Sequence, residues 1–150
     1  MTLDIQPLDP HHATEETLDG YHLMRAAAWA VDFPEDPPLT REGAIGRLRT
    51  PPVHEGPGRV WAGHLDGRPA GTVRLSLPEA PNDGIANVEV CVHPELRRRG
   101  IGTALLRSVL PEVLESGREA KVRARCRMRA AGGRRGRPCR VRSGCRRRRW

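Results

Sequence analysis

The stretch from Val92 to Thr103 holds the residues whose types and spacing are best suited to chemistry. It reads Arg97-x-x-Gly100-x-Gly102, with an apolar strand-like segment before it and a helix-like segment after it. A glycine-containing turn that opens a helix collects unpaired backbone N–H groups at the positive end of the helix dipole. Such a turn predicts an anion site, and phosphate is the usual anion.

The spacing excludes two familiar phosphate loops. No Gly-Lys-Ser/Thr follows the glycines, as a Walker loop requires, and Leu105 stands where a dinucleotide fingerprint needs its third glycine or alanine. With Val92-x-Pro94 upstream, the segment resembles the acyl-CoA signature of the GCN5-related N-acetyltransferases, the GNAT superfamily. The alternative is an ordinary strand-to-helix turn with solvated arginines.

The resemblance implies an acetyl-CoA site built mainly from main-chain groups. In that family the pantetheine arm pairs with the strand before the turn, and the turn with the helix start holds the pyrophosphate. The arginine side chains add positive charge suited to phosphate. The implied cofactor-binding residues are Val90, Cys91, Val92, Arg97, Arg98, Arg99, Gly100, Ile101, Gly102 and Thr103.

Glu89 is the candidate catalytic base. The resemblance places an acid at this strand position, and a carboxylate in a partly buried cleft can accept the proton of an amine. The alternative is a strand glutamate that faces solvent or pairs with an arginine. His93 is the second candidate. Many family members protonate the thiolate with a tyrosine of the fourth helix, but Tyr21 is the single tyrosine here, so that role is not carried over.

The surrounding elements alternate between strands and helices. Apolar residues recur at alternate positions in the strands and every three or four residues in the first helix, whose stripe is Leu18, Tyr21, Met24, Ala28 and Val31. Thr14 and Thr40 are expected helix caps, and Asp66-Gly67 an expected hairpin turn. The pattern predicts strands at 3–8, 59–64, 70–77 and 85–92, and helices from 15 to before Pro34, from 41 to 48 and from 104 to 114. By resemblance this is an α/β GNAT fold, a mixed, mostly antiparallel sheet with flanking helices and an incomplete C-terminal part.

The charge divides the 150-residue chain near residue 119. Residues 1–118 hold 12 arginines against 17 acidic residues, a net charge of −5, whereas 119–150 carry +13. We therefore expect an acetyltransferase core at 1–118 and an arginine-rich tail at 119–150. The negative core favours a cationic, amine-bearing acceptor. No long apolar run or secretory signal is present, which predicts a cytoplasmic protein without a membrane span.

The tail departs from the family pattern. Alternation from Ala120 to Arg129 predicts a fifth strand, after which no apolar periodicity follows. One interpretation is a basic extension that binds nucleic acid or anionic lipid; the other is a reading frame that shifted after about Glu119, since GC-rich codons out of frame yield mainly Arg, Gly, Ala, Pro and Cys. The tail cysteines, Cys126, Cys139 and Cys145, lack zinc-ligand spacing, and the adjacent pair His11-His12 has no third ligand nearby, so no metal site is expected.

The sequence thus predicts an N-acetyltransferase that moves an acetyl group from acetyl-CoA to a primary amine of a small molecule or polypeptide. Two alternatives stay open: a catalytically impaired CoA-binding remnant, and a protein that binds nucleic acid through its tail. The phrase from Asp32 to Pro38 and the strand sequence 88–92 also resemble acetyltransferases of high-GC actinobacteria, some of which carry two such domains in tandem.

Overall fold

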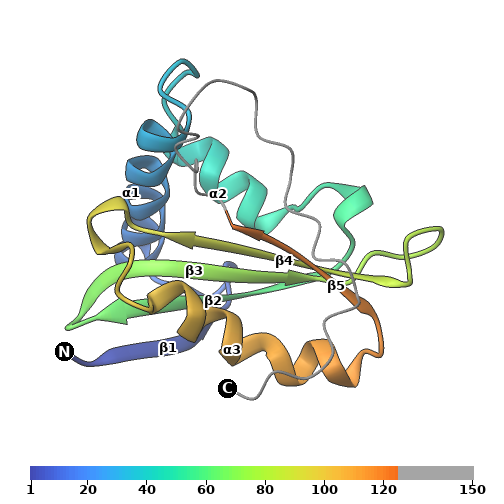
Figure 1. Ribbon diagram of the computed structural model, residues 1–150. Coiled ribbons are helices and arrows are strands. Elements are labelled where there is room, and N and C mark those ends of the chain that lie inside the picture. The colour runs from blue at the N-terminus through green and yellow to red at the C-terminus, as the bar shows by residue number, and fades with distance from the viewer. Residues whose placement is uncertain (125–150) are drawn as a thin grey trace, which may run out of the picture.

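A five-stranded sheet forms the centre of the molecule, and its strands lie in chain order (Figure 1). The computed structural model describes residues 1–124. The first four strands are antiparallel neighbours, and the fifth runs parallel to the fourth. Helices α1 and α2 cover one face and α3 covers the other. The elements are β1 (Leu3–Leu8), α1 (Glu15–Asp32), α2 (Arg41–Arg49), β2 (Gly58–Leu65), β3 (Arg68–Ser76), β4 (Ile85–Val92), α3 (Ile101–Glu115) and β5 (Glu119–Ala124). The predicted α/β class, a mixed and mostly antiparallel sheet with flanking helices, is confirmed.

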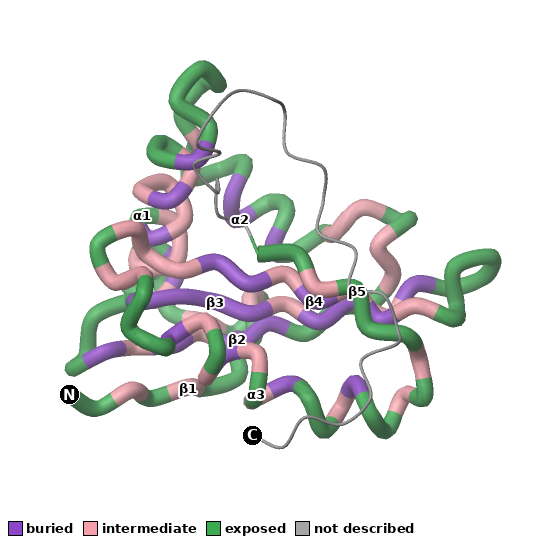
Figure 2. Tube along the Cα trace, viewed as in Figure 1, coloured by how far each residue is buried: buried purple, intermediate pink, exposed green. Residues whose placement is uncertain are grey.

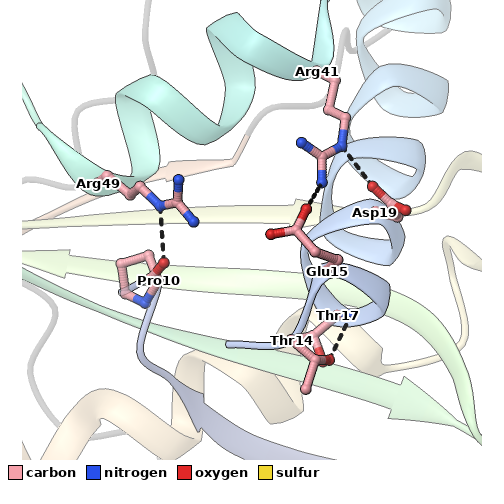
Figure 3. A network of polar contacts seen from close by, with 7 residues as sticks. All are labelled: Pro10, Thr14, Glu15, Thr17, Asp19, Arg41 and Arg49. Carbon is pink, nitrogen blue, oxygen red and sulfur yellow. Dashed lines mark hydrogen bonds and ion pairs between the residues drawn. The ribbon is translucent and has the colours of Figure 1, made fainter. Parts of the chain in front are cut away.

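Both predicted helix caps are present. The Thr14 hydroxyl accepts a hydrogen bond from the Thr17 amide at 3.2 Å, and the Thr40 hydroxyl accepts one from the Gly43 amide at 3.1 Å. Each bond satisfies one of the amides that a helix start leaves without a partner. Arg41 then joins the two helices, because its guanidinium donates to Glu15 and Asp19 of α1 (Figure 3).

The turn between β2 and β3 has the geometry that its sequence predicts. Asp66 has φ 49° and Gly67 has φ 80°, the two positive values of a type I′ turn. Strands paired by this turn run from Gly58 to Leu65 and from Arg68 to Ser76, within one or two residues of the predicted limits.

Two apolar layers hold the helices on the sheet (Figure 2). The larger lies under α3, where Leu105 and Val109 pack on Val73, Val88 and other sheet residues. Trp61, expected in the core or lining a cleft, lies in this layer with 8% of its surface exposed. The second layer lies under α1 and α2 and consists of Leu8, Leu18, Ile45, Leu48 and Val60.

Close packing of α3 on the sheet depends on Gly71. A Cβ at this position would lie 2.7 Å from the carbonyl oxygen of Cys91 and 2.9 Å from Leu105. Only glycine therefore allows β3, β4 and α3 to approach this closely.

The predicted apolar stripe of α1 is wrong at one residue, Val31. Leu18, Met24 and Ala28 are buried as expected, but Val31 is 55% exposed. The buried position is Asp32, four residues after Ala28, because its carboxylate binds an arginine of a distant turn. Apolar spacing alone cannot locate a buried charge.

Helix α3 connects β4 to β5, the crossover that a parallel strand pair requires. β5 begins at Glu119 and pairs with β4 over six positions, from Ile85↔Glu119 to Val90↔Ala124, so the fifth strand exists over these residues. Its predicted continuation to Arg129 and the arginine-rich tail lie outside the described residues, as do the zinc, nucleic-acid and reading-frame interpretations. In the described part of the chain, no helix is long and apolar enough to cross a bilayer.

Candidate functional site

The turn between β4 and α3 presents three consecutive amides at a helix start. Gly100 precedes the helix with φ 78°, and Arg98 also has a positive φ of 66°. The first intrahelical bond runs from the Ala104 amide to the Gly100 carbonyl at 3.0 Å. The amides of Ile101, Gly102 and Thr103 precede it, so none of them has a carbonyl one helical turn earlier to bind. This is the arrangement that binds phosphate at a helix N-terminus.

Arg97 turns away from this amide cluster and into the molecule. Its two terminal nitrogens each bind one carboxylate oxygen of Asp32 at 2.8 Å, and its Nε donates to the Val92 carbonyl at 3.1 Å. The side chains of Asp32 and Arg97 are 3% and 18% exposed. The positive charge of Arg97 is therefore balanced by a buried carboxylate, and the bidentate pair ties the turn to the end of α1.

Arg98 and Arg99 are exposed beside the amide cluster, as is Gly100. The three predicted arginines thus separate into one with an internal carboxylate partner and two on the surface. A role in phosphate binding for Arg98 and Arg99 stays a prediction.

The edge of β4 next to the turn is the predicted place for the pantetheine arm. The His93 amide bonds the Ala70 carbonyl at 2.8 Å, which sets the alternation of the β3–β4 ladder. In an antiparallel ladder every second residue bonds the partner strand, so the main-chain groups of Cys91 face β3. Those of Val90 and Val92 face the β5 side. The Val92 carbonyl already accepts from Arg97, which leaves its N–H directed at that edge.

Glu89 lies on the opposite face of β4 from Val88 and Val90, as predicted. Its carboxylate accepts a hydrogen bond from Arg25 of α1 at 2.9 Å, and the two side chains are 22% and 13% exposed. The Arg25 guanidinium also lies 5.9 Å from the centre of the Tyr21 ring. Burial raises the pKa of Tyr21, with the nearby Arg25 charge opposing it, so the hydroxyl stays protonated well above neutral pH.

A shallow hollow, partly open to solvent, surrounds Glu89 between α1, α2 and the sheet. We call it the arginine recess, and its polar lining is Tyr21, Arg25, Arg47, Thr72, Arg74 and Glu89. A second, separate shallow hollow also has Arg25 in its lining, together with Trp29, Phe33 and Cys91.

The remaining candidates have structural partners. The His93 side chain accepts a hydrogen bond from the Glu95 amide at 3.3 Å, so it caps the short turn that follows β4. His12 binds Asp9 at 2.8 Å on the surface. Burial raises the pKa of the Cys91 thiol, which is 2% exposed. Within residues 1–124 no group of three metal-ligating side chains occurs.

α1 connects the turn between β4 and α3 to the arginine recess. Asp32 holds Arg97 at one point, and Arg25, seven residues earlier, holds Glu89. Seven residues span about 10 Å along a helix axis. The turn after β4 therefore contacts the C-terminal end of α1, where Arg97 binds Asp32.

Sequence reasoning did not select Arg25, Asp32 or Arg74 for this site. The available signal was their placement: Arg25 and Asp32 follow Tyr21 at helical spacing, and Arg74 alternates with the apolar positions of β3. Charged residues on a face that the pattern assigns to the interior indicate internal partners.

Comparisons with known proteins agree with this geometry. Residues 20–131 match the sequence model described as "Acetyltransferase (GNAT) family". A search of curated proteins finds no match. Among solved structures, a tandem GNAT protein from the clavulanic acid biosynthesis pathway is 30% identical with a TM-score of 0.65, over 78% of this chain. This chain spans 34% of that protein's length.

Two more distant structures share the fold. The ribosomal-protein-alanine N-acetyltransferase of Brucella melitensis biovar Abortus 2308 is 19% identical with a TM-score of 0.56, over 83% of this chain and 81% of its own. The PaiA N-acetyltransferase of Thermoplasma acidophilum, solved in complex with coenzyme A, is 16% identical with a TM-score of 0.55, over 78% of this chain and 75% of its own.

Proposed function

The chain belongs to the acetyltransferase (GNAT) family, and from this membership we propose that it transfers an acetyl group from acetyl-CoA to a primary amine. The observation that carries the proposal is the amide cluster at the start of α3, next to the end of β4, where the N–H of Val92 is directed away from β3.

The residues of the turn fit a pyrophosphate. The amides of Ile101, Gly102 and Thr103 converge at a positive helix end, and no side chain caps them within the described chain. We assign them to the pyrophosphate of acetyl-CoA, with Arg98 and Arg99 adding charge at the rim. The PaiA N-acetyltransferase, which shares this fold, is solved in complex with coenzyme A.

Acetyl-CoA supplies the acetyl group as a thioester when bound. The N–H of Val92 is the proposed donor to the thioester carbonyl oxygen, because it faces the β5 side of β4 beyond the last described strand pair, Val90↔Ala124. The main chain of Val90 faces the same side but is in register with Ala124, so its role in aligning the pantetheine arm stays a prediction. The role of Cys91 in this alignment stays a prediction, since its main chain faces β3.

Glu89 is the proposed acceptor of the amine proton. Most primary amines are protonated at neutral pH, so a base must remove a proton before attack. The 2.9 Å ion pair with Arg25 holds the Glu89 side chain in place in the recess, where its carboxylate is the proposed acceptor of that proton.

The first test is a calorimetric titration of the full 150-residue chain with acetyl-CoA. Thr103→Glu and Thr103→Gln form a matched pair, because Thr103 is exposed in the first turn of α3 and both new side chains suit a helix. Glutamate favours the helix dipole but repels phosphate, so only the charged variant should lose binding, by about tenfold or more. Equal acetyl-CoA affinities of the two variants would contradict the assignment of the pyrophosphate to this helix end.

The second test is turnover of Glu89→Gln, which preserves shape and removes the base. We expect unchanged acetyl-CoA affinity and a fall in kcat of about 100-fold or more, the usual contribution of general base catalysis. Binding without turnover in the parent chain would instead support the impaired CoA-binding remnant. Full activity of Glu89→Gln would show that another group accepts the proton.

A further inference from the structure

We infer that the amine acceptor also carries an oxyanion, a carboxylate or a phosphate, which binds Arg74 and Arg47 in the arginine recess. The inference rests on the proposed function and specifies the substrate class of that site. It commits to the chemistry of the group beside Glu89 and not to a particular metabolite.

The charges around the recess do not balance. Three guanidinium groups line it, those of Arg25, Arg47 and Arg74. Within the described residues, the carboxylates in ion pairs with these arginines are Glu89, which binds Arg25, and Glu55, which binds Arg47 and Arg74. Three positive groups therefore face two negative ones.

Arg74 has the longest ion pair of the three arginines. Its nearest described carboxylate oxygen, on Glu55, is 3.6 Å away, beyond hydrogen-bond distance, and Glu55 already binds Arg47 at 2.6 Å. The Nε of Arg74 donates to the Ser76 hydroxyl at 3.2 Å. The side chain is only 14% exposed, so water compensates the charge poorly. An oxyanion at the terminal nitrogens would supply the missing charge-assisted hydrogen bonds.

The floor of the recess is polar where a sheet under helices is usually apolar. Thr72 and Ser76 are 5% and 4% exposed, and they lie on the same face of β3 as Arg74. Packing alone gives no reason for three polar residues in a row on this face. The Tyr21 hydroxyl, protonated because burial raises its pKa, adds a hydrogen-bond donor at the wall.

Glu89 lies in the same recess, so one ligand can meet both groups. Its carboxylate attracts the amine, and the arginines across the recess attract the oxyanion. A bidentate arginine contact would orient the amine toward the base. Local charge here is opposite in sign to the net charge of −5 over residues 1–118, so the acceptor class follows from the recess and not from the overall balance.

The experiment compares amines that differ only in the anionic group. The full chain, saturated with CoA, is titrated with three amino acids and their amides: L-alanine, β-alanine and 4-aminobutyrate against the corresponding amides, with 2-aminoethyl phosphate as the phosphate probe. Binding is followed by ligand-observed NMR, and acetyl transfer from acetyl-CoA by mass spectrometry. Comparing the amino acids with 2-aminoethyl phosphate distinguishes a carboxylate site from a phosphate site.

We expect at least one oxyanionic amine to bind about tenfold tighter than its neutral counterpart, the usual scale of a hydrogen bond to a charged group. Arg74→Gln should remove this preference, and Arg47→Gln, at a half-exposed position that tolerates change, should reduce it. Arg68→Gln removes the same charge from an exposed position on the same strand and should leave the preference intact.

The outcomes separate the inference from the proposed function. Equal binding and acetylation of acids and amides would overturn the inference while the acetyltransferase function stands. If the parent chain binds an acid selectively but does not acetylate it, and Arg74→Gln loses that binding, the result would support the inference and contradict the function. Failure of every probe to bind while acetyl-CoA binds would also overturn the inference.

Discussion

Replacing Asp32 with asparagine tests whether the buried ion pair organises the phosphate turn. The variant keeps the shape of the side chain but removes its charge, so Arg97 loses its bidentate partner at 2.8 Å. Removing one partner of a buried pair usually costs about 3 to 5 kcal/mol of unfolding free energy. Arg97 is 18% exposed and keeps the Val92 carbonyl, so we expect the lower end, about 3 kcal/mol.

The assay is urea unfolding followed by circular dichroism and tryptophan fluorescence. With a slope of about 2 kcal/mol per molar urea, a loss of this size moves the midpoint down by about 1.5 M. The matched control is Glu112→Gln, which breaks the surface pair with Arg59 at 3.2 Å. Glu112 and Arg59 are 34% and 74% exposed, so the control should shift by less than about 0.5 kcal/mol.

A double-variant cycle decides whether the loss belongs to the pair. Asp32→Asn with Arg97→Gln should be less destabilised than the sum of the two single variants, because no uncompensated charge then remains buried. Additive losses, or a loss in Asp32→Asn no larger than in Glu112→Gln, would refute the reasoning. Acetyl-CoA affinity should fall with Asp32→Asn even where the chain is folded, since Arg97 positions the turn.

Three further predictions concern single residues. The absorbance of Tyr21, the only tyrosine, should titrate at higher pH in the folded chain than in urea, because burial raises its pKa. The stability linked to this pKa is complete below about pH 10 and is lost as pH rises further. Coincident titration midpoints in the folded and unfolded chain would contradict the burial of the ring. Gly100→Ala should destabilise the chain by about 1 kcal/mol, because residue 100 has a φ of 78°. Gly102→Ala should stabilise it by up to about 1 kcal/mol, because alanine favours a helix and its Cβ would lie 3.6 Å from Val92, an ordinary contact. Thermal unfolding of both variants checks these opposite signs. The Cys91 thiol, with its pKa raised by burial, should resist iodoacetamide at pH 8 in the native chain and react in urea, as peptide mass spectrometry of the alkylated site would show.

Local features of the chain were predictable because their causes lie within a few residues. Thr14 and Thr40 cap helices by bonding amides three residues later, and Asp66-Gly67 adopts the positive φ values of its turn. The amide cluster at Ile101 to Thr103 follows from the glycine before the helix. The alternation in β4 that separates Glu89 from its valine neighbours also follows from strand geometry.

Partners of the charged residues were not predictable, because they depend on contacts across long sequence separations. Arg97 belonged to a run of three similar arginines, and nothing in that run distinguishes it from Arg98 or Arg99. The distinction comes from Asp32, which is 65 residues away and lies next to the turn only when α1 packs on the sheet. The same packing buries Asp32 and leaves Val31 exposed, the reverse of what the apolar spacing of α1 predicts.

The sequence by itself therefore determined the elements, their order and the amide cluster at the start of α3, since backbone geometry and apolar periodicity act over short distances. Tertiary structure decided which arginine binds an internal carboxylate, which carboxylate Arg25 binds, and that Arg74 and Glu89 line one recess. Those assignments depend on which charged groups from different elements come together and on how far each is exposed to solvent. Only the packing of the helices on the sheet decides both.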